Sequence, residues 1–137
     1  MAKRIYLDSS AIIYLVENAA KKPLVLAALA KYPGYTICSS ALALMECLVQ
    51  PLQNGNQNLV QAYDAYFQIL WLIPSRREVF RRAAEIRAFT NLRTPDALHL
   101  AYASMGRCEA IITGDQKSVS VWNQKKPFLY PQNTILV

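Results

Sequence analysis

Long apolar stretches are absent from this 137-residue sequence, which has no run near the roughly 18 residues that a membrane-spanning helix requires. We also expect no secretory signal peptide. The basic residues at positions 3 and 4 are followed by an aspartate at position 8, inside the segment that would have to be apolar. We therefore expect a cytoplasmic protein with no membrane association.

Sulfur and nitrogen ligands for metals are scarce. The cysteines, Cys38, Cys47 and Cys108, have no CxxC spacing, and the only histidine, His99, has no cysteine near it in the sequence. This pattern argues against a zinc site. It predicts instead that the cysteines are reduced and buried in the core.

The composition is that of a folded, basic domain. Hydrophobic residues make up 53% of the chain, which argues against disorder, and the length fits a single domain over residues 1–137. The formal net charge is +6. A basic cytoplasmic protein tends to meet polyanions such as nucleic acids, although charge alone is a weak indication.

Short runs typical of β-strands alternate with helical segments. The runs contain Ile, Leu, Val or Tyr without strict alternation, as expected when both faces of a sheet are covered. They lie at residues 4–7, 35–38, 70–73, 110–113 and 134–136. The alternation predicts an α/β fold with a mainly parallel sheet between two helical layers, and a binding crevice beyond the carboxyl ends of the strands.

The helical segments have recognisable ends. Predicted start signals are Pro23, Ser39 or Ser40, Ser75 in a capping box with Glu78, and Thr94–Pro95; predicted stop signals are Pro33–Gly34, Pro51 and Gly106. The polar residues 51–58 are expected to form a mobile loop. Aromatic residues at positions 63, 66 and 67 form a helical stripe that favours core or dimer contacts.

Four acidic residues stand at notable positions. Asp8 directly follows the first strand, Asp115 lies two residues past the fourth, and Asp96 falls in the first turn of the helix that begins near Thr94. Singly, these aspartates have structural interpretations as a helix cap, a turn residue or a partner of a helix dipole. Glu46 differs, because it lies in an apolar helix and no lysine or arginine occurs between Lys31 and Arg76. It requires either a raised pKa or a cation from elsewhere in the fold.

Taken together, the four acids indicate a metal site if they converge. At about 6 Å, each pair of like charges costs roughly 3 kcal/mol at an effective dielectric constant of 20. Mg²⁺ or Mn²⁺ would compensate this repulsion with oxygen ligands, and the alternatives are partial protonation or acids that never meet. In a basic protein, such a metal favours the hydrolysis of phosphodiester bonds.

At these positions the chain resembles the PIN-domain ribonucleases, and more narrowly the VapC-type toxins of toxin–antitoxin pairs. The residues that carry the resemblance are YLDSSAIIYL at 6–15, the isolated Glu46, LRTPDALHLAYA at 92–103 and IITGD at 111–115. Their order and spacing fit the family over nearly the whole chain. Ser118 departs from it, because the family often has a large apolar residue at that place.

The resemblance implies a three-layer α/β/α sandwich and an endoribonuclease that depends on Mg²⁺ or Mn²⁺. It also implies a homodimer and inhibition by a small antitoxin protein. Asp8, Glu46, Asp96 and Asp115 become the catalytic and metal-binding acids, with Asp8 and Asp96 as the foremost ligands. Ser10 and Thr113 match hydroxyl positions that support these acids.

Other interpretations remain open. Arg93 and Lys117 are candidates for RNA phosphate contacts because each lies within three residues of a site acid, whereas the arginines of segment 76–87 favour a solvated helix face. His99 favours a packing role over that of a general base. The alternative function is a catalytically inactive PIN-like module that binds RNA. A receiver-like signalling domain is disfavoured, because serines rather than acids follow Asp8.

Overall fold

The computed structural model describes residues 3–125, 131 and 133–137. Strands and helices alternate along the chain as predicted. In chain order they are β1 (Arg4–Leu7), α1 (Ser9–Val16), α2 (Lys22–Ala30), β2 (Thr36–Ser39), α3 (Ala41–Gln53), α4 (Gln57–Ile69), β3 (Trp71–Leu72), α5 (Arg77–Phe89), α6 (Thr94–Met105), β4 (Ala110–Thr113), α7 (Gln116–Lys125) and β5 (Asn133–Leu136).

The five strands form one parallel sheet in the order β3-β2-β1-β4-β5. From β1 the chain continues to β2 and β3 on one side and later adds β4 and β5 on the other. The order of the strands therefore reverses at β1, and in such sheets ligands bind beyond the carboxyl ends of the strands at that point. Asp8 and Asp115 follow the two strands that meet there.

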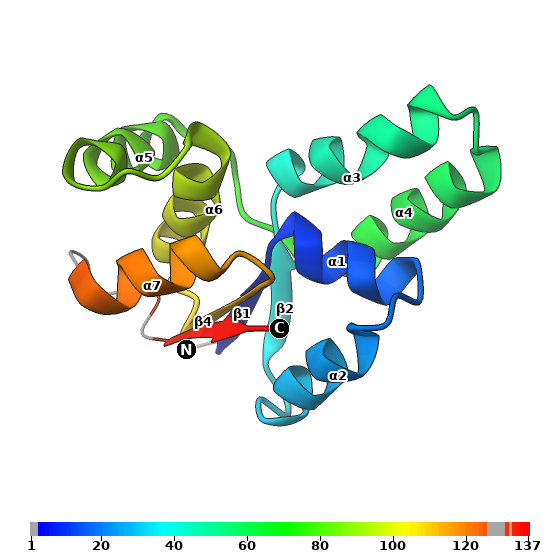
Figure 1. The fold of residues 1–137 in the computed structure, drawn as a ribbon, viewed down its shortest axis with the longest axis horizontal. Helices are drawn as coiled ribbons and strands as arrows, with labels where there is room; N and C mark the ends of the chain where they lie inside the picture. Colours follow the sequence, from blue (N-terminus) through cyan, green and yellow to red (C-terminus); the bar gives the residue numbers. More distant parts are fainter. Residues whose placement is uncertain (1–2, 126–130, 132) are drawn as a thin grey trace.

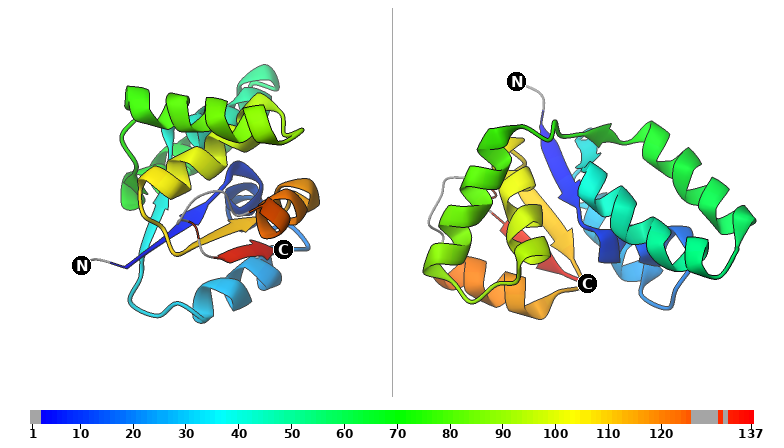
Figure 2. Two further views of the ribbon diagram at one scale, coloured as in Figure 1. Left: turned by 90° about the vertical axis from the view of Figure 1, so that its left-hand side faces the viewer. Right: turned by 90° about the horizontal axis from the view of Figure 1, so that it is seen from above.

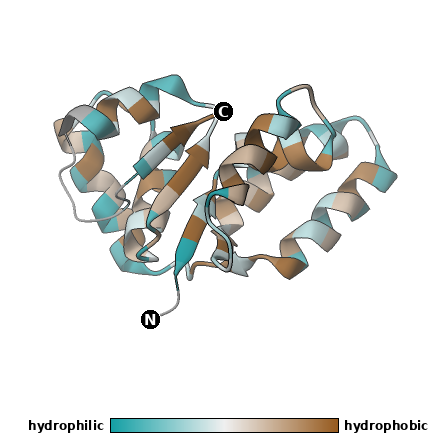
Figure 3. Ribbon diagram, turned by 90° about the horizontal axis from the view of Figure 1, so that it is seen from below, coloured by the Kyte–Doolittle hydropathy of each residue, from teal (hydrophilic) through white to brown (hydrophobic). Residues whose placement is uncertain are grey.

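Helices cover both faces of the sheet, which confirms the predicted α/β/α layers (Figures 1 and 2). Along β1, Ile5 and Leu7 pack into a core built with α1, α2, α3 and α4, whereas Tyr6 faces the core of α5, α6 and α7. Alternate residues of one strand thus enter different cores. This two-sided burial explains why the strands lack an apolar–polar alternation and are coloured largely hydrophobic in Figure 3.

Two predicted element boundaries are wrong for local reasons. The helix α3 does not stop at Pro51 but continues to Gln53. Proline removes only its own N–H bond in the last turn, and the Asn54 N–H still donates to the Gln50 carbonyl at 3.0 Å. The loop predicted at 51–58 is therefore reduced to three residues between α3 and α4.

Predicted capping at two helix starts is also wrong. The Ser75 hydroxyl lies 2.8 Å from the Tyr102 hydroxyl, and α5 begins after Arg76 with no side-chain cap. Thr94 is the first residue of α6 rather than its cap, and its hydroxyl accepts from Arg87 at 3.0 Å. Gly106 ends α6 as predicted.

The cysteines are buried free thiols, as predicted. Tyr63 and Phe67 are core residues, which confirms the packing role of the aromatic stripe. Among the described residues, the helices are too short or too polar for any to cross a bilayer.

Candidate active site

Asp8 is fixed at the end of β1 by three hydrogen bonds. Its backbone is extended and its Oδ1 accepts from the Ala11 N–H at 3.0 Å, so it caps α1. The Ser10 hydroxyl also donates to Oδ1, at 2.6 Å, and the Thr113 hydroxyl donates to Oδ2. A carboxylate has about four acceptor positions. Asp8, only 7% exposed, therefore keeps one free acceptor position on Oδ2.

The two hydroxyls join α1 to the turn after β4. Ser10 Oγ accepts from the Gly114 N–H at 2.8 Å, and Thr113 Oγ1 accepts from the Asp115 N–H at 2.9 Å. Gly114 allows this close approach, because a Cβ there would lie 2.7 Å from the Tyr14 hydroxyl oxygen. The predicted supporting residues Ser10 and Thr113 thus both contact Asp8.

Asp115 lies just before α7 and its side chain binds the first turn of that helix. Its Oδ1 accepts from the Lys117 N–H at 3.1 Å, and its Oδ2 accepts from the Ser118 hydroxyl at 2.6 Å. Ser118 is buried. A hydrogen bond from Ser118 therefore anchors Asp115.

We expect Ser118→Ala to lower the free energy of unfolding by about 1.5–3 kcal/mol, because it removes one hydrogen bond to a charged group. It also frees the Asp115 carboxylate to change rotamer. The melting temperature of the variant should fall relative to that of Ser120→Ala, a control at an exposed serine of the same helix. Equal values for the two variants would show that Ser118 does not hold Asp115.

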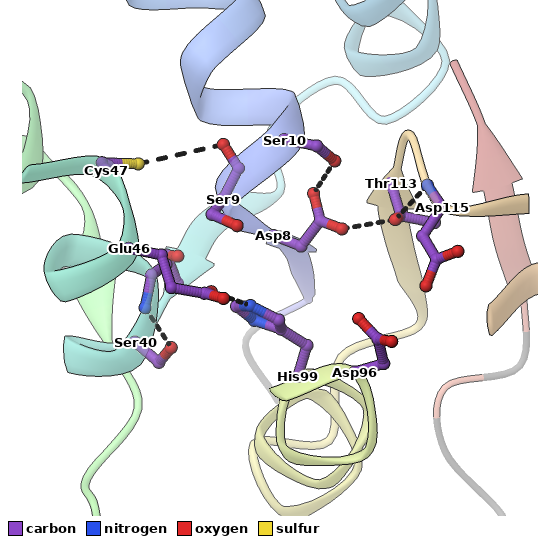
Figure 4. Close-up of polar contacts among 12 residues, drawn as sticks. Asp8, Ser9, Ser10, Ser40, Glu46, Cys47, Asp96, His99, Thr113 and Asp115 are labelled. Atoms are coloured by element: carbon purple, nitrogen blue, oxygen red, sulfur yellow. Dashed lines mark hydrogen bonds and ion pairs between the residues drawn. The ribbon is translucent and has the colours of Figure 1, made fainter. Parts of the chain in front are cut away.

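Asp96 lies in the first turn of α6 and faces Asp115 (Figure 4). Burial raises the pKa of Asp96, and the negative charge of Asp115 raises it further. Arg93 Nε lies 3.4 Å from Asp96 Oδ2, but the Arg93 side chain is 81% exposed. The charge and hydrogen bond of Arg93 lower the pKa of Asp96, but they do not outweigh burial and the charge of Asp115, so this pKa stays above its ordinary value.

Glu46 has a hydrogen-bond partner from elsewhere in the fold. Its Oε1 lies 2.5 Å from His99 Nε2 on α6. Burial would raise the pKa of Glu46, but the hydrogen bond and charge interaction with His99, a hydrogen bond from Ser9 and the positive charge of Arg93 hold it below its ordinary value. The alternative of a raised pKa is therefore wrong, and Glu46 is ionised at neutral pH.

The structure brings the four acids to one edge of the sheet. Asp8, Asp96 and Asp115 come from three elements around β1 and β4, and Glu46 reaches the same region from α3 through His99 (Figure 4). Over residues 3–125, 131 and 133–137, no three Asp, Glu, His or Cys side chains form a ready-made metal site. The donors are nonetheless all oxygen atoms, which fits Mg²⁺ or Mn²⁺.

Comparison with known families decides the assignment of the fold. The family model of the PIN domain matches residues 5–121, which include all four acids. The chain belongs to the PIN domain family. Among proteins with curated descriptions, none matches this PIN domain at a significant level.

Solved structures share the fold at low sequence identity. A toxin–antitoxin complex from Klebsiella pneumoniae has a TM-score of 0.70 at 22% identity, over 85% of this chain and 90% of the other. VapBC2 from Rickettsia felis, bound to a promoter DNA fragment, gives 0.68 at 16% identity, over 98% and 97% of the two chains. VapBC-1 from nontypeable Haemophilus influenzae gives 0.69 at 14% identity, over 88% and 93%.

Basic residues flank the acidic edge of this PIN domain. Lys117 Nζ donates to the Asn91 carbonyl at 2.9 Å, and Arg87 Nε donates to the Leu92 carbonyl at 3.1 Å. These contacts hold the loop before α6 from both sides. Arg93, on that loop, points its exposed side chain toward the site, where its charge acts on both Asp96 and Glu46.

Sequence reasoning missed two residues at the site of this PIN domain. Tyr6 and Ser40 are fully buried, and their hydroxyls connect to His99. Tyr6 lies within an apolar strand, where a tyrosine is an ordinary core residue. Only the position of Tyr6 two residues before Asp8 could have drawn attention to it.

Proposed function

We propose that this PIN domain is a metal-dependent endoribonuclease that hydrolyses RNA phosphodiester bonds. The observation that carries the proposal is the convergence of Asp8, Asp96 and Asp115 at the point where the strand order reverses, where burial and the charge of Asp115 raise the pKa of Asp96. Carboxylates held in mutual repulsion are poised for a cation rather than for structural stability.

The ion would be Mg²⁺ or Mn²⁺, held by Asp8, Asp96 and Asp115, with Glu46 completing the cluster. Such an ion, when bound, polarises a phosphoryl oxygen and stabilises the charge that develops on the leaving oxygen. Asp8 supports this role because its three donors fix it in one rotamer while leaving one acceptor position on Oδ2.

Glu46 and the basic residues supply the remaining parts. Glu46 is ionised and held by His99 and Ser9, and the acceptor positions that remain on its carboxylate would take a hydrogen bond from the attacking water and orient it. Arg93 is exposed, so its side chain is accessible to an RNA phosphate. Lys117 adds positive charge on the other side of the same loop.

The partner that fits best is a small antitoxin protein, with the PIN domain as the toxin of the pair. Three solved structures of the same fold are toxin–antitoxin or VapBC complexes. Met45, Val49 and Leu52 also form an exposed apolar stripe along α3, of the kind that protein partners cover. We propose a cytoplasmic homodimer inhibited by this antitoxin.

The decisive experiment incubates the purified chain with single-stranded and structured RNAs. We expect internal cleavage with Mg²⁺ or Mn²⁺ and none with EDTA. Gel electrophoresis of the end-labelled RNA measures this cleavage. RNA that stays intact over long incubation with either ion would exclude the nuclease.

A second candidate is an RNA-binding module that does not cleave. One observation favours it: two of the acids are already engaged within the protein, Glu46 by His99 and Asp115 by the first turn of α7. This alternative predicts RNA binding of equal strength with Mg²⁺ and with EDTA, measured by fluorescence anisotropy.

A further inference from the structure

A buried chain of hydrogen bonds runs from the start of α3 to the acidic site. The Ala43 N–H donates to Ser40 Oγ at 3.2 Å, and Ser40 Oγ lies 2.8 Å from the Tyr6 hydroxyl. The Tyr6 hydroxyl lies 2.7 Å from His99 Nδ1, and His99 Nε2 lies 2.5 Å from Glu46 Oε1. Ser40 caps α3, Tyr6 lies in β1, His99 lies in α6, and Glu46 lies in α3.

The chemistry of the groups gives this chain a direction. An ionised carboxylate only accepts, so the proton on the imidazole is at Nε2, facing Glu46. When the imidazole is neutral, its Nδ1 is an acceptor and takes the hydrogen of the Tyr6 hydroxyl. The tyrosine oxygen then accepts from Ser40, whose oxygen already accepts from the helix backbone. With a neutral imidazole, each hydrogen of the Ser40, Tyr6 and His99 side chains along the chain thus has one acceptor.

The chain also connects the two layers of the sandwich. Helix α3 packs with the core on one face of the sheet, and α6 packs with the core on the other. Ser40 caps α3 and Glu46 lies within it, so the network holds this helix at two points. Asp96 is one turn before His99 on α6 and shares its face. The network therefore sets the position of Glu46 relative to Asp96.

An apolar core would be the simpler solution at these positions. Phenylalanine at 6 and leucine at 99 would fill the space without burying hydroxyl and imidazole groups, which are costly to bury unless fully paired. Here all of them are paired, and among the described residues no buried side-chain nitrogen or oxygen lacks a partner. A fully satisfied network of this kind gives a single rigid geometry.

We propose that His99 is a positioning residue, which Tyr6 and Ser40 lock in the Nε2–H tautomer so that it fixes one oxygen of Glu46 and directs the other into the acidic site. The proposal rests on the nuclease function above and adds a residue through which Glu46 acts. His99 itself touches neither metal nor RNA in this arrangement.

Three variants and one matched control test this role by RNA cleavage. We expect His99→Asn, whose amide is too short to reach Glu46, to lower kcat about 10- to 100-fold with little change in KM. His99→Gln restores part of kcat, because its longer amide can place an N–H near the position of Nε2. Tyr6→Phe lowers kcat by about tenfold, because the imidazole loses the partner that selects its tautomer.

Tyr102→Phe is the matched control. Tyr102→Phe removes a hydroxyl on α6 that lies 2.8 Å from the Ser75 hydroxyl. Tyr6→Phe likewise removes a hydroxyl on β1 that lies 2.8 Å from the Ser40 hydroxyl. We expect Tyr102→Phe to keep the wild-type kcat even where it lowers the melting temperature as much as Tyr6→Phe does. A kcat within twofold of wild type in His99→Asn overturns the positioning role.

Double variants show whether His99 acts through Glu46. On the Glu46→Gln background, His99→Asn should cause little further loss of kcat, because the group that His99 positions has already been changed. An undiminished further loss would overturn the proposal, since His99 would then act independently of Glu46.

The tautomer supplies a measurement that does not depend on cleavage. In wild-type protein labelled with ¹⁵N, we expect a single His99 tautomer with the proton on Nε2, and a mixture of tautomers in Tyr6→Phe. A wild-type imidazole that interconverts between tautomers overturns the proposal. If wild type cleaves no RNA, the proposed function fails, and this spectrum still decides whether the network holds His99 as described.

Discussion

Asp8→Asn is expected to reduce metal-dependent RNA cleavage about a thousandfold while the protein stays folded. Asparagine is as good a helix cap as aspartate, so the bond from the Ala11 N–H to position 8 survives. The charge is lost, and the amide must also face the hydroxyls of Ser10 and Thr113, which both donate to Asp8 in the native protein. Losing a metal contribution of about 4 kcal/mol corresponds to roughly a thousandfold in rate.

The measurement compares kcat/KM on one RNA at saturating Mg²⁺ and Mn²⁺, together with thermal unfolding of each variant. Asp64→Asn is the matched control, because it makes the same chemical change at an exposed position of α4. Similar melting temperatures with a large difference in activity would place Asp8 in the reaction. Equal activity of Asp8→Asn and Asp64→Asn would remove Asp8 from the mechanism.

The architecture could be predicted from the sequence because burial on both faces leaves a direct signature. The two predicted strands nearest the centre of the sheet, Arg4–Leu7 and Ala110–Thr113, have the predicted bounds in the structure. Their residues face two cores in turn, and only continuously apolar segments can do so. The acids at the ends of these strands were then found by the rule that parallel strands present their carboxyl ends at one edge.

Local signals failed where a tertiary contact was stronger. Ser75 has the spacing of a capping box, but its hydroxyl faces Tyr102, 27 residues further along the chain. The partner of Glu46 could not be predicted for the same reason. His99 lies 53 residues from Glu46 in the sequence, and Tyr6 lies 93 residues before His99. Sequence spacing contains no information about pairs that only the folded sheet brings together.

Asp115 shows that a structural role and a site role are compatible. The sequence left open whether this residue was an ordinary turn residue or a site acid. It binds the first turn of α7 through Lys117 and Ser118 and still lies close enough to Asp96 to raise its pKa. An acid that caps a helix has a fixed rotamer, and a fixed rotamer is what a metal ligand requires.

Asp96→Asn is expected to have two opposite effects, a loss of cleavage of about a hundredfold or more and a more stable metal-free protein. The loss follows from removing one of the proposed metal ligands. The gain follows from the pKa of Asp96, which burial and the charge of Asp115 raise in the folded state. A carboxyl whose folded pKa is raised favours folding only while it is protonated, below its unfolded pKa of about 3.9. That contribution disappears as the pH rises through the folded pKa, so at neutral pH the ionised Asp96 opposes folding and asparagine does not.

Melting temperatures from pH 4 to 8, with EDTA and with Mn²⁺, separate the two effects. In EDTA, the stability of Asp96→Asn relative to wild type should increase as the pH rises through this range, because only wild type gains the buried charge. Adding Mn²⁺ should reverse the order, since an ion at 100 times its Kd stabilises wild type by about 2.7 kcal/mol and the variant binds it weakly. Asp64→Asn should follow wild type under both conditions. If Mn²⁺ stabilises Asp96→Asn as much as wild type, Asp96 is not a metal ligand. If Asp96→Asn has a lower melting temperature than wild type at pH 7 in EDTA, the ionised Asp96 does not destabilise the metal-free protein.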